Sequence, residues 1–375
     1  MRDVLEDLFA WWEAGETVGV ATVVGTWKSA PRTAGAAMVV GPHGEAVGSV
    51  SGGCVEGAVY DLATEIAADP LLPPALERYG VTDDDALAVG LTCGGMIDIF
   101  VERVSRSAFP ELGDIVASVG AGEPVAVVTC VGPAGSDRFG RRLVLWPGRT
   151  SGSLGLARLD EAVTDDARGM LAAGRTGTLH YGMDGERRGD ELTLSVVSYA
   201  PPPRMIVFGA IDFAAALAGT GSFLGFDVTV CDARPVFATA RRFPAADRVV
   251  VDWPHRYLAA EAEAGRIDPR TVLCVLTHDP KFDVPLLELA LRLDVAYVGA
   301  MGSRRTHDDR TARLREQGVP AEDLAKLRSP IGLDLGARTP EETAISIAAE
   351  IVAARWSGDG TPLTRTTGPI HHEAA

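Results

Sequence analysis

The sequence predicts an α/β protein: a C-terminal Rossmann-like parallel sheet with a separate N-terminal α+β domain. From Met205 to Arg355, short apolar runs bounded by glycine alternate with helical segments. This alternation is typical of βαβ units whose helices cover both faces of a parallel sheet. Before it stand Pro201, Pro202 and Pro203, a tract that no helix crosses and that favours a stiff, extended connection. We therefore expect domains over 1–200 and 204–356, followed by a C-terminal tail over 357–375.

The N-terminal region begins with an amphipathic helix. Its apolar residues Val4, Leu5, Leu8, Phe9 and Trp12 fall on one face, as in a helix that docks on a core. Apolar runs then predict strands, and Gly-rich turns separate the later ones, so this domain is expected to be α+β. No internal repeat stands out. The expected strands are 18–26, 36–40, 96–102, 123–130, 141–146 and 192–198, with a helix over 54–68.

The C-terminal region has a more regular pattern. Its apolar runs suit buried parallel strands because both faces of such a sheet are covered. Thr339, Pro340 and Glu342 form a capping-box sequence at the start of the last helix, so that segment is structural. The expected strands are 205–210, 226–232, 248–252, 271–277 and 295–299, with helices at 214–225 and 285–293.

Composition excludes several classes of protein. The chain has 35 basic and 51 acidic side chains, a net charge of −16, which disfavours nucleic acid and anionic lipid as partners. No apolar stretch approaches the ~20 residues of a membrane-spanning helix. The acidic N-terminus lacks a small-residue cleavage site, so we expect no signal peptide and a cytoplasmic location. Five cysteines without a CxxC pair indicate neither a disulfide framework nor a zinc ribbon.

The turn after the first Rossmann strand is the usual place for a dinucleotide phosphate. Only Gly209 of the G-x-G-x-x-G pattern is present. A branched side chain at Ile211 would crowd the phosphate and Asp212 would repel it, so binding of NAD(P) is expected to be weak or absent. Asp232 ends the second strand, where an acid commonly holds a ribose hydroxyl. It can equally be a helix cap, and both interpretations stand.

Two later loops also lie at the carboxyl edge of the predicted sheet, where α/β proteins bind ligands. His278 follows the strand 271–277. Gly302, Ser303, Arg304 and Arg305 follow the strand 295–299 and lead into a helix, so they form a candidate anion site. The alternative for this second loop is a capped helix with solvated arginines.

Two Cys-Gly loops are the candidate site of the N-terminal domain. Cys54 follows Gly52 and Gly53 at the expected start of a helix, which favours a thiolate, the form that binds soft metals. The alternative for each thiol is a small buried hydrophobe in a Gly-rich turn. Cys130, Cys231 and Cys274 lie inside apolar strands and are expected to be core residues. The second loop comprises Cys93, Gly94 and Gly95, and Arg32 lies in a further turn suited to an anionic ligand.

At this point the sequence resembles the XdhC/CoxI family. The segments 21–40, 48–59 and 91–102 look like that family's N-terminal motifs, and 297–305 and 330–351 look like its C-terminal Rossmann domain. The stretch from 105 to 200 carries no comparable motif. The family commonly has a G-x-G followed by His where this chain has Gly209, Ala210, Ile211 and Asp212.

The resemblance implies an accessory protein for xanthine dehydrogenase and related molybdenum hydroxylases. Such a protein would bind the molybdenum cofactor, as molybdopterin or its nucleotide form, protect it during sulfuration and deliver it to the apo-enzyme. Cys54 and Cys93 are then the candidate metal ligands, and the chain is a carrier rather than a catalyst. A cysteine desulfurase and a second copy of the chain are further candidate partners.

Two alternatives come from other classes. The first is an NAD(P)-dependent oxidoreductase, which Ile211 and the lack of a convincing acid–base pair disfavour; His278 with Asp279 is its best candidate pair. The second is a thiol redox sensor that uses Cys54 and Cys93, whose separation in space the sequence does not give.

Overall fold

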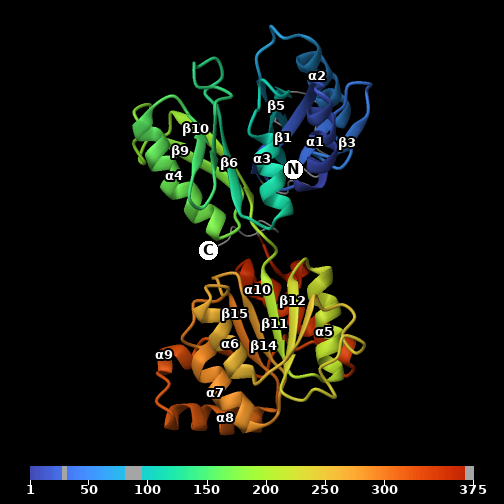
Figure 1. Cartoon of the computed structure of the whole chain (residues 1–375), viewed down its shortest axis with the longest axis vertical. Helices are drawn as coiled ribbons and strands as arrows, with labels where there is room; N and C mark the ends of the chain where they lie inside the picture. Colours follow the sequence, from blue (N-terminus) through green and yellow to red (C-terminus); the bar gives the residue numbers. More distant parts are fainter. Residues whose placement is uncertain (28–31, 81–94, 368–375) are drawn as a thin grey trace. The chain divides into compact units, whose positions relative to one another are not determined.

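The computed structural model describes residues 1–27, 32–80 and 95–367 of the chain. It divides into two compact units, Met1–Pro201 and Pro202–Ala375 (Figure 1). The fold class predicted from the sequence is confirmed: the second unit holds one parallel sheet, and the first combines antiparallel sheets with helices. None of the helices in the described ranges is long and apolar enough to cross a membrane.

The first unit contains two five-stranded antiparallel sheets, each with its own helix. We call residues 1–104 the first half and residues 105–201 the second half. The first half has the strand order β3-β2-β1-β5-β4 and the second β8-β7-β6-β10-β9. The elements of the first half are α1 (Leu5–Ala14), β1 (Val18–Trp27), β2 (Ala37–Val40), β3 (Ala46–Gly48), α2 (Glu56–Ala68), β4 (Ala75–Gly80) and β5 (Met96–Val104). Those of the second are α3 (Leu112–Gly120), β6 (Val125–Gly132), β7 (Arg142–Leu145), β8 (Thr150–Gly152), α4 (Ala157–Ala172), β9 (Gly177–Tyr181) and β10 (Leu192–Tyr199).

The two halves repeat one motif, so the expectation that the chain has no internal repeat was wrong. Each half runs helix, three strands, helix, two strands, and its strands pair in the same order. Residues 14–25 (AGETVGVATVVG) and 121–132 (AGEPVAVVTCVG) are identical at eight of twelve positions. The backbone contacts are also equivalent: Gly35 N–H donates to Val23 O, and Gly140 N–H donates to Cys130 O, both at 2.8 Å.

The repeat extends to the loop that leads into the second helix of each half. Gly48 and Gly152 both have a positive φ, +87° and +81°, and a Cβ on either would collide with a backbone carbonyl of the preceding strand. The next residue is a serine in both halves. Ser49 donates to the carboxylate of Glu56, and Ser153 donates to that of Asp160, each seven residues further on, both at 2.7 Å. The loop therefore has the same backbone turn and the same serine–carboxylate contact in both halves.

Apolar clusters hold the helices and sheets of the first unit together. One cluster joins α2 to the outer face of the first sheet, and another joins α4 to that of the second. A third cluster lies between the sheets and includes Leu8 of α1, Ile115 of α3 and Val127 of β6. The buried ion pair of Glu102 with Arg142 links β5 to β7 across this interior. The first unit is thus a layered structure whose cores are formed without the second unit.

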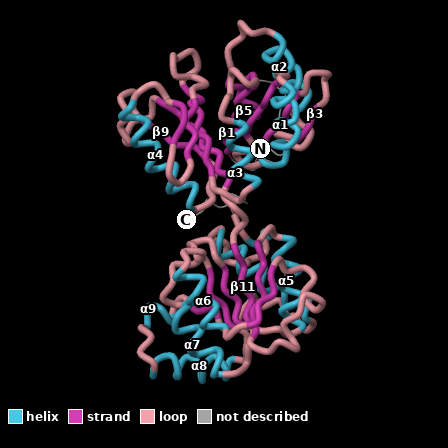
Figure 2. The backbone as a smooth tube through the Cα atoms, viewed as in Figure 1, coloured by secondary structure: helices cyan, strands magenta, loops and turns pink. Residues whose placement is uncertain are grey.

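The second unit is a six-stranded parallel sheet in the order β13-β12-β11-β14-β15-β16, with helices on both faces (Figure 2). This is the doubly wound arrangement, with its switch point between β11 and β14. Its strands are β11 (Arg204–Phe208), β12 (Asp227–Asp232), β13 (Arg248–Val251), β14 (Val272–Val275), β15 (Tyr297–Ala300) and β16 (Leu327–Arg328). Its helices are α5 (Asp212–Phe223), α6 (Pro254–Glu263), α7 (Pro280–Ala290), α8 (Arg304–Glu316), α9 (Ala321–Leu324) and α10 (Pro340–Arg355).

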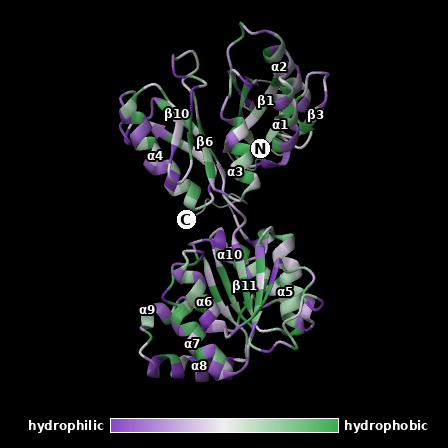
Figure 3. Cartoon of the chain, viewed as in Figure 1, coloured by the Kyte–Doolittle hydropathy of each residue, from purple (hydrophilic) through white to green (hydrophobic). Residues whose placement is uncertain are grey.

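The sheet is apolar because it is buried on both sides (Figure 3). One core cluster joins it to α5 and α10, and another joins it to α6, α7 and α8. The predicted capping box is confirmed, since Thr339 and Glu342 bond reciprocally at the start of α10. Three helix boundaries were wrong. The helix expected over 214–225 covers Asp212–Phe223. The helix expected over 285–293 covers Pro280–Ala290, because Asp279 caps it and Pro280 takes its first turn. The helix expected to begin at Cys54 begins at Glu56.

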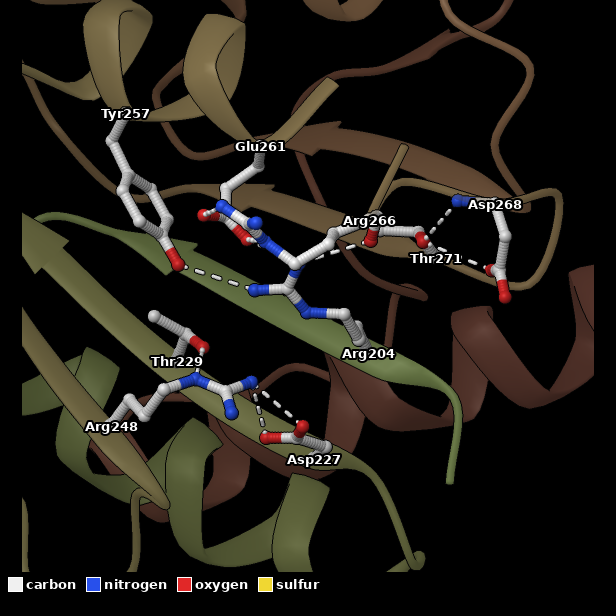
Figure 4. A network of polar contacts seen from close by, with 9 residues as sticks. All are labelled: Arg204, Asp227, Thr229, Arg248, Tyr257, Glu261, Arg266, Asp268 and Thr271. Carbon is white, nitrogen blue, oxygen red and sulfur yellow. Dashed lines mark hydrogen bonds and ion pairs between the residues drawn. The ribbon is translucent and has the colours of Figure 1, made fainter. Parts of the chain in front are cut away.

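A polar network holds the amino-terminal edge of this sheet (Figure 4). Arg204, at the start of β11, donates to Glu261 of α6 at 2.6 Å and to the hydroxyl of Tyr257 at 3.2 Å. Arg266 donates to the same carboxylate at 2.6 Å, and Arg248 pairs with Asp227 at 2.7 Å. Charged groups therefore fix the strand starts at this edge, while the loops at the opposite, carboxyl edge carry the candidate ligand residues.

Candidate functional site

The carboxyl edge of the Rossmann sheet centres on the turn after β11. Gly209 has φ +112°, and a Cβ there would lie 3.0 Å from the backbone of Leu276 and Thr277. Glycine is therefore required where β11 and β14 approach each other at the switch point. The N–H of Gly209 donates to Cys231 O at 2.9 Å, so the turn is also tied to β12.

Asp232 anchors this turn. Its buried carboxylate accepts hydrogen bonds from Ala210 N at 2.7 Å and from Arg234 N and Nε, both at 2.9 Å. Burial alone would raise the pKa of Asp232, but the hydrogen bonds from Arg234 and from the two backbone amides outweigh it and lower the pKa. Asp232 is therefore ionised and already bound to protein donors. A ribose hydroxyl would have to share it with Arg234.

Ile211 and Asp212, the two residues expected to obstruct a phosphate, both have partners within the protein. Asp212 pairs with Arg242 at 3.1 Å, which offsets its negative charge. Arg242 also donates to Ala210 O at 3.2 Å, so it lies directly beside the turn. Ile211 is half-buried and packs against the core cluster under α5. The local charge is thus balanced, and weak NAD(P) binding stays a prediction that rests on the missing glycines.

The loop after β14 contributes His278, Asp279 and Lys281. His278 is exposed. Asp279 accepts from Lys281 N at 3.1 Å, as the cap of α7, and pairs with Lys281 Nζ at 2.9 Å. These contacts with Lys281 lower the pKa of Asp279, and the charge of nearby Arg234 adds to the effect. Arg234 of the loop after β12 is therefore near enough to the carboxylate of Asp279, in the loop after β14, for their charges to act on each other.

A buried network supports the same edge from below. Thr277 donates to Asp283 of α7, and Asp283 pairs with Arg310 of α8 at 2.9 Å. Arg310 also donates to Met301 O at 2.9 Å and to the hydroxyl of Ser329 at 3.2 Å. One guanidinium thus fixes the loops after β14, β15 and β16. Sequence reasoning missed this group; the available signal was an arginine four residues before Leu314, on the buried face of its helix.

The loop after β15 is built as a helix start. Ser303 caps α8 by accepting from Thr306 N at 3.1 Å. Gly302 has φ +153°, and a Cβ there would lie 3.0 Å from the Thr306 side chain. Arg304 and Arg305 are exposed. This geometry supports the structural interpretation of Ser303, and anion binding by the arginines stays a prediction.

In the first unit, Glu56 organises the loop that carries Cys54. Its carboxylate accepts hydrogen bonds from Ser51 N at 2.9 Å and Gly53 N at 2.8 Å, and from the hydroxyls of Ser49 and Ser51. Although burial opposes it, this set of donors lowers the pKa of Glu56 to about 2. The start of α2 therefore already holds an internal anion.

The expectation that Cys54 lies at the start of a helix, where its thiolate would be favoured, was wrong. The thiol precedes the helix by two residues, and the amides around it donate to Ser51 and Glu56. Gly52 and Gly53 have positive φ values of +76° and +116°, and nothing lies within 4 Å of a Cβ placed on either. They are needed for the conformation of the loop rather than for close packing, and Cys54 is left half-buried.

The candidate residues thus fall into two groups. Gly209, Asp232, His278, Gly302, Ser303 and Arg304 follow the strands of one sheet edge in the second unit. Gly52, Gly53, Cys54, buried Gly95 and exposed Arg32 belong to the first unit, and Cys93 and Gly94 lie outside the described residues. Within the described ranges, no three His, Cys, Asp or Glu side chains group as a metal site would require. Metal binding by Cys54 with Cys93 stays a prediction.

Comparison with known families matches both units. A model of the XdhC and CoxI family matches residues 11–80 and 118–182, and a model of the XdhC Rossmann domain matches residues 205–351. The match over 118–182 falls in a stretch where the sequence alone offered no motif. Its two segments begin 107 residues apart, the same offset as between residues 14–25 and 121–132 of the repeat.

Individual relatives agree with this match. A protein of Bacillus subtilis named as a probable xanthine dehydrogenase component is 28% identical over 352 residues, which are 92% of this chain and 94% of the relative. The molybdenum cofactor insertion chaperone PaoD of Escherichia coli is 28% identical over 169 residues, 45% of each chain. A crystal structure from Bacillus halodurans, described as a xanthine dehydrogenase, has 25% identity and a TM-score of 0.66, and covers 96% of this chain and 98% of that one.

Proposed function

Because this chain belongs to the XdhC and CoxI family, we propose that it is an accessory protein that binds the molybdenum cofactor and delivers it to a molybdenum hydroxylase of the xanthine dehydrogenase type. The observation that carries the proposal is that the family match spans both units, with a relative named for insertion of this cofactor. On this proposal the chain holds and transfers its ligand, and the apo-enzyme performs the chemistry.

Each unit, taken by itself, offers donor groups that suit such a ligand. The cofactor supplies a molybdenum centre held by sulfur and an anionic phosphate tail. Cys54 offers a soft thiol on an opened loop, which suits the metal end. Arg234 and Arg242 lie beside the turn at Gly209, which suits the phosphate.

At the sheet edge, the ligand would have to exchange partners with the protein. Arg234 and Lys281 are each paired with a carboxylate, Asp232 and Asp279. A phosphate would share these cations rather than find free ones, so binding should be moderate and salt-dependent. Moderate affinity suits a carrier, because the ligand must leave for the apo-enzyme.

The test is to purify the full chain from a molybdenum-replete host and from a host that cannot make the cofactor. We expect the first preparation alone to contain pterin, measured by fluorescence after oxidation, and to restore activity to an apo molybdenum hydroxylase. Neither preparation should oxidise substrates by itself. NAD(P)-dependent turnover by the isolated chain, or the absence of pterin from both preparations, would refute the proposal.

Arg304 and Arg305 allow a sharper test with a matched control on the same helix. Replacing both with Gln should reduce cofactor retention while changing the free energy of unfolding by no more than ~0.5 kcal/mol, as for other surface changes. Replacing Arg313 and Arg315, at the far end of α8, should leave retention unchanged. Equal retention in the two double variants would assign Arg304 and Arg305 to the solvated helix surface.

A further inference from the structure

A cavity of about 220 Å³ lies at the amino-terminal end of β15, at the opposite edge of the sheet from the candidate site. Its walls come from the end of α7, the first residues of β15, the segment at β16 and the last turn of α10. Ala290, Leu293, Val298 and Tyr297 are among its lining residues, so the wall has both apolar and polar parts. The apolar part suits the body of a small ligand.

The charged groups at this cavity are all basic. Lys326 and Arg328 line it, and no acidic side chain does so among the described residues. This is contrary to the composition of the chain, in which 51 acidic side chains outnumber 35 basic ones. Lys326 is partly neutralised, because it pairs with Asp323 at 2.7 Å and donates to Leu291 O at 3.3 Å.

Arg328 is the cation that remains for a ligand. It lies on the edge strand β16 and is exposed, and it takes part in none of the ion pairs found in the described part of the chain. Its charge acts on the hydroxyl of Tyr297, which donates to Glu350 at 2.5 Å, so Arg328 is close to the cavity wall and to one carboxylate behind it. A guanidinium presents paired N–H groups that match the oxygens of a carboxylate or a phosphate.

We infer that this cavity binds a small organic anion, with Arg328 holding its carboxylate or phosphate and the apolar part of the lining in contact with its body. The volume is below the ~300–1,000 Å³ of pockets that enclose drug-sized ligands, so the occupant is a compact molecule. The site lies at the opposite edge of the sheet from the turn at Gly209, and it does not depend on the proposed function.

The test uses benzoate, phenyl phosphate, acetate and the neutral analogue benzyl alcohol as probes, with the full chain and titration by calorimetry or ligand-observed NMR. We expect benzoate or phenyl phosphate to bind, acetate to bind more weakly because it lacks the apolar body, and benzyl alcohol to bind at least ~10-fold more weakly. That ratio corresponds to one charge-assisted hydrogen bond of about 1.5 kcal/mol.

Three variants locate the binding. Arg328→Gln removes the charge, and Ala354→Phe fills the cavity from its exposed rim; each should weaken probe binding ~10-fold or more with an unchanged circular dichroism spectrum. Arg315→Gln, an exposed position on α8, is the control and should bind as the parent does. Equal binding of benzyl alcohol and benzoate, unchanged binding in Arg328→Gln, or no binding of either aromatic anion would overturn the inference.

Discussion

Arg310 shows how much one side chain contributes to the candidate site. It is buried with Asp283, and it links three loops that the sequence separates by about fifty residues. Burial raises the pKa of Asp283, while its contacts with Thr277 and Arg310 favour the ionised form. The cost of burying two charges offsets most of their attraction, so the pair adds little net stability. Its main contribution is to fix the geometry of this sheet edge.

We predict that Arg310→Met lowers the free energy of unfolding by ~3–5 kcal/mol, because Asp283 is then buried without its cation. The double variant Asp283→Leu with Arg310→Met should be more stable than Arg310→Met alone, since no buried charge remains. Chemical denaturation measures both, and Arg313→Met, an exposed neighbour on α8, is the control. Additive losses in the double variant would mean that the two side chains act independently.

The described cysteines should differ in reactivity. Burial raises the pKa of the Cys130 thiol, and burial with nearby acids raises that of Cys231 to about 12; burial also raises that of Cys274. Cys54 is half-buried on an opened loop. We predict that an alkylating reagent at neutral pH labels Cys54 before these three, as mass spectrometry of the peptides would measure. Faster labelling of Cys130 or Cys274 would move the candidate site away from Cys54.

Cofactor retention gives a separate reading of Cys54. Cys54→Ser keeps nearly the same volume but replaces a soft sulfur with a hydroxyl, so we predict loss of bound cofactor with an unchanged fold. Cys93→Ser should change retention in the same direction. Cys130→Ser is the control in an apolar strand, and full retention in both loop variants would remove the thiols from the site.

At the scale of elements, the two halves of the repeat can be compared at the loop that precedes the second helix of each. Glu56 and Asp160 occupy equivalent positions, but Asp160 lies inside the first turn of α4, whereas Glu56 is the first residue of α2. In the first half, Gly52 and Gly53 replace a helical turn with a loop, and Cys54 lies on it. The same serine–carboxylate contact thus caps a helix in one half and shapes an exposed loop in the other.

We predict that Glu56→Gln and Asp160→Asn lower the stability by similar amounts, ~1–2 kcal/mol, because each weakens charge-assisted hydrogen bonds at a helix start. Only Glu56→Gln should alter the alkylation rate of Cys54, since its carboxylate fixes that loop. Thermal unfolding and the labelling rate are the two measurements. A change in Cys54 labelling of the same size in Asp160→Asn would contradict a role particular to the first half.

Some elements could be predicted from the sequence and others could not. The strands of the Rossmann sheet could be predicted, because parallel strands are buried on both faces and appear as continuous apolar runs. The start of α2 was placed too early, because the apolar pattern does not reveal that Gly52 and Gly53 have positive φ. The repeat was missed because, apart from residues 14–25 and 121–132, its two copies share mainly scattered turn residues such as Gly48 and Gly152. The network of Arg310 required contacts that only the fold brings together.

At the scale of the molecule, acid should weaken the second unit through Glu261. Hydrogen bonds from Arg266 lower the pKa of Glu261 from 4.5 to about 2. Burial opposes this shift, and the contact with Arg204 adds to it. A carboxyl with a depressed pKa contributes stability above its unfolded value that is lost as the pH falls toward its folded value. We predict a loss on the order of 3 kcal/mol between about pH 4.5 and pH 2, the equivalent of the shift.

Chemical denaturation of the parent and of Glu261→Gln across this range measures that contribution. The variant should be less stable at neutral pH, because Arg204 and Arg266 lose their common partner, and should depend less on pH in the acid range. Glu263→Gln, an exposed acid on the same helix, is the matched control. Parallel pH profiles for the parent and Glu261→Gln would assign the acid sensitivity to other carboxyls.

The two units should also fold separately. Each has its own core clusters, and the chain passes between them through Pro201, Pro202 and Pro203. A unit with a complete core needs no partner to offset its loss of chain entropy. We predict that residues 1–201 and 202–375, expressed apart, each unfold cooperatively, and that both transitions appear in calorimetry of the whole chain. If the second unit alone is folded, the first requires contacts beyond its own clusters, and the Cys54 loop must then be studied only in the full chain.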